Sequence, residues 1–281
     1  MNPGVLLKKI FFLAFAVFFC LACPHHAAMA ESASREHAKK PLFCATPSSI
    51  MLHSRDGVYG MRWLANAIEK NGLQTMTYRQ VSQLWQGGHC PPENAILVSL
   101  DDLGSSWLSR EFKNMISVFT DKGYVLTLAV VTGGDEKQQN AEIWDYLKAL
   151  DAQGLEIASH SAWHSLLESR KDKSIQQEAD LSYQLICEHL GRCPVTFVLP
   201  FGRGLESERV MRILQKRYTN IVSIPGPFLF YKKPFLFKRI PLVRSEENPS
   251  QPKLGAPFFI RIKENGFNPH PAWRLPNQQA Q

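Results

Sequence analysis

The sequence predicts an α/β fold, a (β/α) barrel formed by a single domain. Short apolar runs rich in β-forming residues alternate with amphipathic helical patterns, which is the order expected of parallel βαβ units. Seven or eight such runs occur, and this number favours a barrel over an open, doubly wound sheet, which stays the alternative. The length agrees, because α/β barrels of about 250 residues are commonly single domains.

The expected strands are apolar runs that are shorter than most helices. They span residues 48–52, 73–78, 95–100, 124–131, 155–159, 195–199, 220–224 and 237–243. Amphipathic segments between them predict helices near 57–71, 105–122, 137–153, 166–190 and 205–217. The stretch 228–239 interleaves aromatic and basic residues, but no glycine-rich or nucleic-acid-binding pattern accompanies it, so we interpret it as a buried strand and its loop.

The N-terminus has the layout of a secretory signal peptide. Two lysines precede an apolar run over 10–23, and the small-residue pattern AMA follows at 28–30. Cleavage there leaves 281 − 30 = 251 residues, and we expect export to the periplasm or the extracellular space. The expected organisation is a signal peptide over 1–30, a loose segment over 31–47, the domain over 48–245 and a Pro/Asn/Gln-rich tail over 246–281. No later segment is apolar for long enough to span a membrane.

Charge and cysteine usage narrow the possible partners. Cleavage removes two lysines and no acidic residue, so the formal net charge falls from +7 to 7 − 2 = +5, an excess that solubility explains without a nucleic-acid partner. Four of the six cysteines remain, Cys44, Cys90, Cys187 and Cys193, which permits two disulfides in an exported protein. Four cysteines can pair in three ways, and the spacing of six residues makes a local bridge between Cys187 and Cys193 plausible. After cleavage, the remaining chain has no C-x-x-C pair of a zinc ribbon.

Ionisable and turn-forming residues follow four of the expected strands. They are His53 after the first strand, Asp101 and Asp102 after the third, His160 after the fifth, and Pro200, Phe201 and Gly202 after the sixth. Barrel enzymes place their sites at the carboxyl ends of the strands. We therefore expect these residues to converge on one site.

The acidic pair and the histidine pair each have an ordinary explanation as well. Adjacent carboxylates point in different directions, so one can bind a cation while the other takes a proton, but one could instead cap the helix expected near Ser105. On a helix, His160 and His164 would share a face and could bind one metal ion, or they are two ordinary histidines. The metalloprotease pattern H-E-x-x-H does not fit, because Ser161 stands in place of its glutamate.

Two histidines and one carboxylate together form a ligand set that leaves positions open for water and substrate. A divalent metal ion in that set would polarise a carbonyl group, and the second carboxylate could act as a general base. Zn²⁺ is the first expectation, and Co²⁺, Ni²⁺ or Fe²⁺ suit the same ligands.

Three motifs in this order resemble the polysaccharide deacetylase family, the NodB-homology or carbohydrate esterase 4 domain. SLDDLG (99–104) is similar to the family's T-F-D-D-G, HSAWH (160–164) to H-[ST]-x-x-H, and LPFGRG (199–204) to the motif that ends in Pro-Tyr/Phe-Gly. IMLHS (50–54) resembles the family's opening M-Y-H, and FKRIPL (237–242) resembles the Arg-Ile ending of the poly-N-acetylglucosamine deacetylase branch. The resemblance covers residues 48–244 and implies a distorted, NodB-like (β/α) barrel.

The resemblance also implies a role for each matching residue. Asp101 matches the catalytic base, and Asp102, His160 and His164 match the metal ligands. Pro200, Phe201 and Gly202 match the loop that lines the substrate groove, where a backbone N–H helps to hold the oxyanion. His53, in the IMLHS segment, joins the expected substrate-binding residues.

The sequence also departs from the family pattern. Leu100 and Leu103 replace the Phe and Gly of T-F-D-D-G. The arginine that precedes Pro-Tyr-Gly in many members and steadies the base is missing, and Arg203, which follows the motif, is one possible substitute. The late Leu-x-His motif that supplies a general acid has no match, which leaves His53 and His270 as candidates for that role.

The function expected from these observations is metal-dependent removal of acetyl groups from an N-acetylglucosamine-containing polysaccharide or oligosaccharide. The missing arginine and acid favour an alternative, a catalytically silent, metal-containing domain that binds carbohydrate or acts as a scaffold. A further alternative within enzymes is hydrolysis of another acyl group, such as O-acetyl or formyl.

Overall fold

The computed structural model describes Cys44 and residues 46–103, 108–133, 140–224, 235–241, 243–244 and 252–253. All of them belong to one compact unit, Pro41–Gln281. The expected signal peptide over 1–30, most of the 31–47 segment and most of the 246–281 tail lie outside the described residues, as does His270. Among the helices of the described ranges, none combines the length and the apolar character needed to cross a bilayer.

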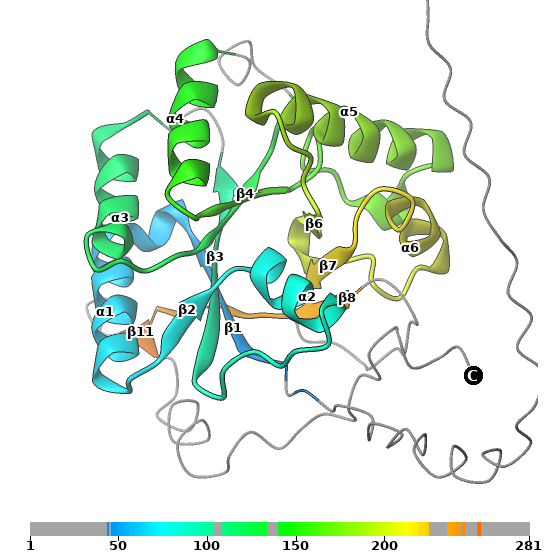
Figure 1. The fold of residues 1–281 in the computed structure, drawn as a ribbon. Coiled ribbons are helices and arrows are strands. Elements are labelled where there is room, and N and C mark those ends of the chain that lie inside the picture. The colour runs from blue at the N-terminus through cyan, green and yellow to red at the C-terminus, as the bar shows by residue number, and fades with distance from the viewer. Residues whose placement is uncertain are drawn as a thin grey trace, which may run out of the picture. The chain divides into compact units, whose positions relative to one another are not determined.

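A nine-stranded sheet forms the centre of the unit (Figure 1). Its strands are β1 (Ser48–His53), β2 (Gln74–Met76), β3 (Ala95–Leu103), β4 (Thr127–Val130), β5 (Glu156–Ser159), β6 (Thr196–Val198), β7 (Asn220–Ser223), β8 (Phe235–Lys238) and β9 (Ile240–Pro241). They follow the order β8-β7-β6-β5-β4-β3-β1-β9, and β2 pairs with β3 beside this path. Every pairing in the sheet is parallel, as the βαβ pattern predicts.

The connection between β8 and β9 shows that the sheet is nearly closed into a barrel. β8 pairs with β7 at one edge of the sheet, and β9 pairs with β1 at the other edge. A single residue, Arg239, separates the two strands in the chain. Because one residue spans at most about 3.6 Å, the two edges of the sheet must lie next to each other. The expected strand over 237–243 is therefore divided, and its halves lie on the two sides of this closure.

In the described ranges, six α-helices connect the strands (Figure 1). They are α1 (Gly57–Lys70), α2 (Tyr78–Gln86), α3 (Arg110–Thr120), α4 (Ala141–Ala152), α5 (Asp172–Leu190) and α6 (Glu208–Leu214). Five of them were expected. α3 begins at Arg110, where the Ser109 hydroxyl accepts a hydrogen bond from Phe112 N–H, and not near Ser105. The idea that Asp101 or Asp102 caps this helix is therefore wrong.

The boundary between β2 and α2 corrects a strand prediction. The strand expected over 73–78 ends at Met76, and Tyr78 already belongs to a helix. Thr77 caps this helix, because its hydroxyl accepts from Gln80 N–H at 3.2 Å while the Gln80 amide oxygen accepts from Thr77 N–H at 2.9 Å. This reciprocal capping box outweighs the strand preference of the apolar residues before it.

Alternating side chains of the strands divide the apolar core into an inner and an outer part. Ile96, Val98 and Leu100 of β3 pack with α1, α3 and α4, whereas Leu97 packs with α2. Tyr78, Val81 and Trp85 of α2 meet apolar side chains from β3 to β8, so this helix fills the interior of the barrel from one end. A third cluster lies between α5, α6 and the outer side of β6 and β7. This alternation fixes which residues of β3 can face inward.

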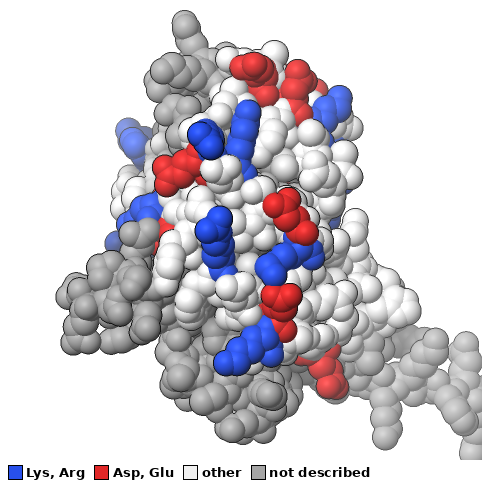
Figure 2. All heavy atoms as spheres, turned by 90° about the vertical axis from the view of Figure 1, so that its left-hand side faces the viewer, with Lys and Arg blue, Asp and Glu red and all other residues white. Residues whose placement is uncertain are grey.

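Two disulfides tie loops to this framework. Cys44 bonds to Cys90, and Cys187 at the end of α5 bonds to Cys193, so the local bridge suggested by the short spacing is confirmed. The outer face made by α1 and α3 carries interspersed charges of both signs (Figure 2). The ion pair between Lys122 and Glu69 links the turn after α3 to α1, with 2.6 Å between Nζ and Oε2.

Candidate metal and acid–base site

Asp101 lies inside the barrel because of the alternation along β3. Leu97, Ser99 and Asp101 point to the same side of the strand, and Asp101 is only 2% exposed. A buried carboxylate needs a partner, and Arg239 supplies one. Its Nη1 donates to both oxygens of Asp101 at 2.6 Å and to Ser99 Oγ at 2.8 Å. The carboxylate is thereby held in one orientation.

Arg239 is fully buried among further polar groups. Burial alone would lower its pKa, but the charge and hydrogen bond of Asp101, together with the electrostatic effects of Tyr78 and Asp102, outweigh that effect and the pKa is raised. Tyr78 is nearby, and its hydroxyl lies 2.5 Å from Ser49 Oγ. Burial raises the pKa of Tyr78 to about 12, so this hydroxyl stays neutral beside the charged pair.

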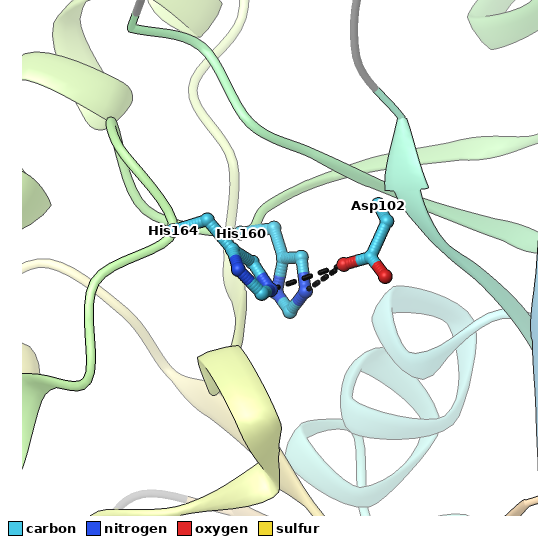
Figure 3. A group of neighbouring side chains, drawn as sticks. All are labelled: Asp102, His160 and His164. Atoms are coloured by element: carbon cyan, nitrogen blue, oxygen red, sulfur yellow. Dashed lines mark ion pairs between the residues drawn. The ribbon is translucent and has the colours of Figure 1, made fainter.

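Asp102 leaves the strand in a different direction. Strict alternation would send its side chain outward like that of Leu100, but Asp102 has a left-handed backbone with φ 59°, and the register of β3 against β4 shifts between Leu100 and Leu103. This irregularity turns the Asp102 carboxylate toward the loop that follows β5 (Figure 3). The two adjacent carboxylates therefore contact different partners, Asp101 a guanidinium and Asp102 two imidazoles.

His160 follows β5 and is held by its backbone and its ring. Ala158 packs into the barrel interior, and alternation sends His160 to the same side. The Nδ1 atom of His160 lies 2.8 Å from the carbonyl oxygen of Val198, which can only accept a hydrogen bond. The proton of a neutral ring is therefore on Nδ1, and the lone pair of Nε2 points to the centre of the site.

His164 reaches the same place without a helix. The expectation that helical spacing pairs the two histidines is wrong, because residues 160–166 form a loop in which Ser161 has φ 64° and His164 has φ 53°. The Ser161 hydroxyl accepts a hydrogen bond from His164 N–H at 2.9 Å. These two left-handed residues reverse the chain, so that the imidazole rings lie 4.7 Å apart, centre to centre.

The three side chains meet at one carboxylate oxygen (Figure 3). Asp102 Oδ1 lies 3.3 Å from His160 Nε2 and 3.0 Å from His164 Nε2. When both nitrogens of each ring carry a proton, hydrogen bonds from His160 and then His164 hold the pKa of Asp102 far below its ordinary value, although burial opposes them. One ligand atom from each residue lies within 4.8 Å of the others.

This arrangement fits a divalent metal ion. With the proton of His160 on Nδ1, an unprotonated Nε2 and an Asp102 oxygen would present lone pairs to each other, which is unfavourable unless a cation lies between them. A carbonyl that orients the ligating imidazole through its other nitrogen is common in metal sites. Imidazole and carboxylate donors suit Zn²⁺, Co²⁺, Ni²⁺ or Fe²⁺.

Two further expected residues border the cluster. His53 Nε2 lies 3.6 Å from Asp102 Oδ2, and the backbone N–H of His53 donates to the buried carboxylate of Asp56 at 2.7 Å. The ring of Phe201, which is 55% exposed, lies 4.5 Å from the ring of His164. His53 and Phe201 thus approach the cluster from different strand ends.

The Pro200–Gly202 turn depends on its glycine. Gly202 has φ 63°, and a Cβ there would lie 2.6 Å from two side-chain carbons of Ile224. The Ser223 hydroxyl donates to the Gly202 carbonyl at 2.8 Å. The turn that carries Phe201 is therefore fixed in place on β7.

The arginine that contacts Asp101 is Arg239, and not Arg203, the substitute suggested by the sequence. Arg203 pairs with Glu168 at 2.6 Å, and 63% of its side chain is exposed. Asp101 and Arg239 are 138 residues apart, which hides their contact from any local pattern. One signal was available: Arg239 is one of two charged residues, with Lys238, within an apolar run expected to be a buried strand. A charged side chain on the buried side of such a strand needs a buried partner of opposite charge.

Sequence comparison connects part of the chain to a known family. Residues 88–219, just under half of the chain, match the family model described as Polysaccharide deacetylase. This segment contains Asp101, Asp102, both histidines and the Pro200–Gly202 turn. Comparison with curated protein sequences gives no match.

Solved structures share the fold. The deacetylase PplD of Streptococcus pyogenes, solved with acetate, is similar to 74% of this chain over 96% of its own, with a TM-score of 0.58 and 14% identity. A de-N-acetylase of Aggregatibacter actinomycetemcomitans has a TM-score of 0.56 and 14% identity, over 69% of this chain and 93% of its own. IcaB of Ammonifex degensii has a TM-score of 0.52 and 16% identity, over 71% of this chain and 94% of its own. At such identities the likeness concerns the fold, and the expected NodB-like (β/α) barrel is confirmed.

Proposed function

We propose that this chain is a metal-dependent polysaccharide deacetylase that removes N-acetyl groups from an N-acetylglucosamine-containing polymer. The observation that carries the proposal is the pair of adjacent carboxylates with separate surroundings. Asp101 is buried and fixed by Arg239, whereas Asp102 faces two imidazole nitrogens. On this proposal a base and a cation site lie side by side, and the 3.8 Å between Asp101 Oδ2 and His160 Nε2 supports it. The family model that matches residues 88–219 supports the same reaction.

Asp102, His160 and His164 would hold the metal ion, and we expect Zn²⁺ first, with Co²⁺, Ni²⁺ or Fe²⁺ as alternatives. A divalent ion supplies a Lewis acid that polarises a carbonyl group and makes water more acidic. Asp101 acts as the general base that removes a proton from the attacking water. The N–H of Phe201 donates to the oxygen of the tetrahedral intermediate, and the Pro200–Gly202 turn holds that donor in place.

A general acid must protonate the amine as it leaves. His53 is our candidate, because its ring borders the cluster from the end of β1 and is 3.6 Å from Asp102 Oδ2. An imidazole can give up a proton near neutral pH, which suits the role. His270, the other candidate, lies outside the described residues.

Exposed aromatic side chains next to the cluster support a carbohydrate substrate. Trp163 is 49% exposed and precedes His164 in the chain, and the ring of Phe201 lies tilted against the same imidazole. Rings at the edge of a site offer flat apolar surfaces to the C–H faces of sugars. The similarity to a solved de-N-acetylase makes an N-acetylated polymer our first choice over O-acetyl or formyl groups. Two disulfides support export to the periplasm or beyond.

The silent carbohydrate-binding alternative loses one of its two arguments. It rested on the missing arginine and the missing general acid, and the contact of Arg239 with Asp101 weakens the first of these. A domain without catalysis would have little need for a buried base restrained by a buried cation, since such a pair is expensive to desolvate. We therefore rank hydrolysis above binding alone.

The Asp101→Asn variant tests the assignment of the base. The amide keeps the shape but cannot take a proton, so acetate release from chitooligosaccharides should fall about 10²- to 10⁴-fold while metal content stays at the wild-type level. Acetate is measured enzymatically and metal by elemental analysis of the purified protein. Activity equal to wild type would remove Asp101 from its role. Glycan binding without acetate release by the wild-type protein would favour the silent domain instead.

A further inference from the structure

Backbone strain is concentrated at the site. In the described part of the chain, four residues other than glycine have a positive φ: Asp102, Ser161, His164 and Phe201. Two of them, Ser161 and His164, lie in the loop that carries both histidines. Such conformations are unfavourable for residues with a Cβ and persist only where surrounding contacts impose them. We therefore looked for the groups that hold this loop.

One side of the loop is held by the end of β4. Thr132 N–H donates to the Ser161 carbonyl at 3.3 Å, and Gly133 N–H donates to the Ala162 carbonyl at 2.6 Å. A Cβ on Gly133 would lie 2.7 Å from that carbonyl oxygen and 2.9 Å from Nε1 of Trp163. This side is thus a close backbone contact that only glycine permits.

The other side is held by two buried side chains of α5. Glu178 Oε2 accepts a hydrogen bond from Trp163 N–H at 2.9 Å. One turn further along the helix, the Ser182 hydroxyl lies 2.7 Å from Ser159 Oγ, which in turn accepts from Ser161 N–H at 3.3 Å. Residues four apart on a helix share a face, so α5 presents Glu178 and Ser182 to the loop together.

The burial of Glu178 is unusual for a carboxylate. It is 3% exposed, and no ion pair of the described ranges includes it. Burying a carboxylate costs free energy unless hydrogen bonds compensate, and its bond to the Trp163 N–H leads directly to the loop. That amide group precedes His164 by one residue, so the bond restrains the chain immediately before a ligand.

We propose that Glu178 is a positioning residue that holds the 160–164 loop in its strained conformation and thereby sets the metal affinity of Asp102, His160 and His164. The inference rests on the proposed function in one respect, namely that this cluster binds a divalent ion. Outer residues that orient metal ligands typically change affinity by about 10- to 100-fold when they are removed.

Metal affinity of full-length Glu178→Ala and Glu178→Gln proteins tests the proposal without any substrate. Zn²⁺ and Co²⁺ dissociation constants are measured by competition with a chromophoric chelator, and the visible absorption of the Co²⁺ form reports the ligand geometry. We expect Glu178→Ala to bind about 10- to 100-fold more weakly, with an altered Co²⁺ spectrum. Glu178→Gln should recover most of the affinity, because its amide oxygen can still accept from Trp163 N–H.

Ile186→Val is the matched control. Ile186 is a buried residue of the same helix that packs in the cluster of α1, α3 and α4, so its truncation should lower the melting temperature without changing metal affinity. An unchanged affinity in Glu178→Ala would overturn the proposal, and so would a Glu178→Gln protein as weak as Glu178→Ala. A wild-type protein that binds neither ion would instead refute the proposed metal dependence.

Discussion

Asp101 and Asp102 are adjacent in the chain, yet their side chains lie in different surroundings. Asp101 continues the inward alternation of β3 and meets a buried guanidinium, whereas the left-handed backbone of Asp102 turns its side chain, 43% exposed, toward two imidazoles. The difference between an expected base and an expected ligand thus follows from one irregular residue in a strand. At the residue scale, the pairing of Asp101 with Arg239 can be tested directly.

Arg239→Met should destabilise the protein by about 3–5 kcal/mol, because it leaves the Asp101 carboxylate buried without its counter-charge. The same change in an Asp101→Asn background should cost clearly less, since a neutral amide needs no cation. Urea unfolding of the four proteins at pH 7 gives the coupling between the two positions. An equal cost in both backgrounds would show that Arg239 acts through packing alone. If Arg239→Met does not fold, Arg239→Lys, which keeps a charge, provides the milder comparison.

At the scale of elements, the sequence predicted the strands well because each is a short apolar run rich in β-forming residues. It failed where a local hydrogen bond or a distant contact decided the structure. The Thr77–Gln80 capping box starts α2 inside an expected strand, and left-handed residues, not a helix, bring His160 and His164 together. The match of Arg239 to Asp101 depends on the closure of the sheet, which no local window contains.

The two disulfides should differ in their contribution to stability. Cys44–Cys90 closes a loop with a sequence separation of 46, and Cys187–Cys193 one with a separation of 6. In a chain-entropy treatment, such loops contribute about 4 and about 2 kcal/mol. Replacing Cys44 and Cys90 with serine should therefore lower the unfolding free energy more than replacing Cys187 and Cys193. Denaturant titration under non-reducing conditions measures both, and a reversed order would contradict the prediction.

For the whole molecule, the nearly closed barrel brings together groups from distant parts of the chain. Asp102 comes from β3, both histidines from the loop after β5, Phe201 from the turn after β6 and His53 from the end of β1. A metal ion held by Asp102, His160 and His164 would link β3 to the loop after β5, across the intervening strand β4. Such an ion binds the folded state and not the unfolded chain, so it should stabilise the entire domain.

Metal at 100 times its dissociation constant should stabilise the protein by about 2.7 kcal/mol and raise the melting temperature by roughly 5–10 °C. The melting temperature with Zn²⁺, compared with that in a chelator, measures the effect. His160→Ala and His164→Ala each remove a ligand and should abolish most of the shift. If both variants kept the full shift, the ion would be bound elsewhere.

The position of Arg239 also imposes an order on assembly. All three expected metal ligands lie between residues 102 and 164, while the arginine that restrains Asp101 belongs to the closure between the last two strands of the barrel. As the chain emerges during synthesis, the complete ligand set is present long before Arg239. A shortened product that ends ahead of β8 would keep every ligand and lack the group that fixes the base. Asp101 is thus restrained by Arg239 only in chains that have been synthesised as far as the last strands of the barrel.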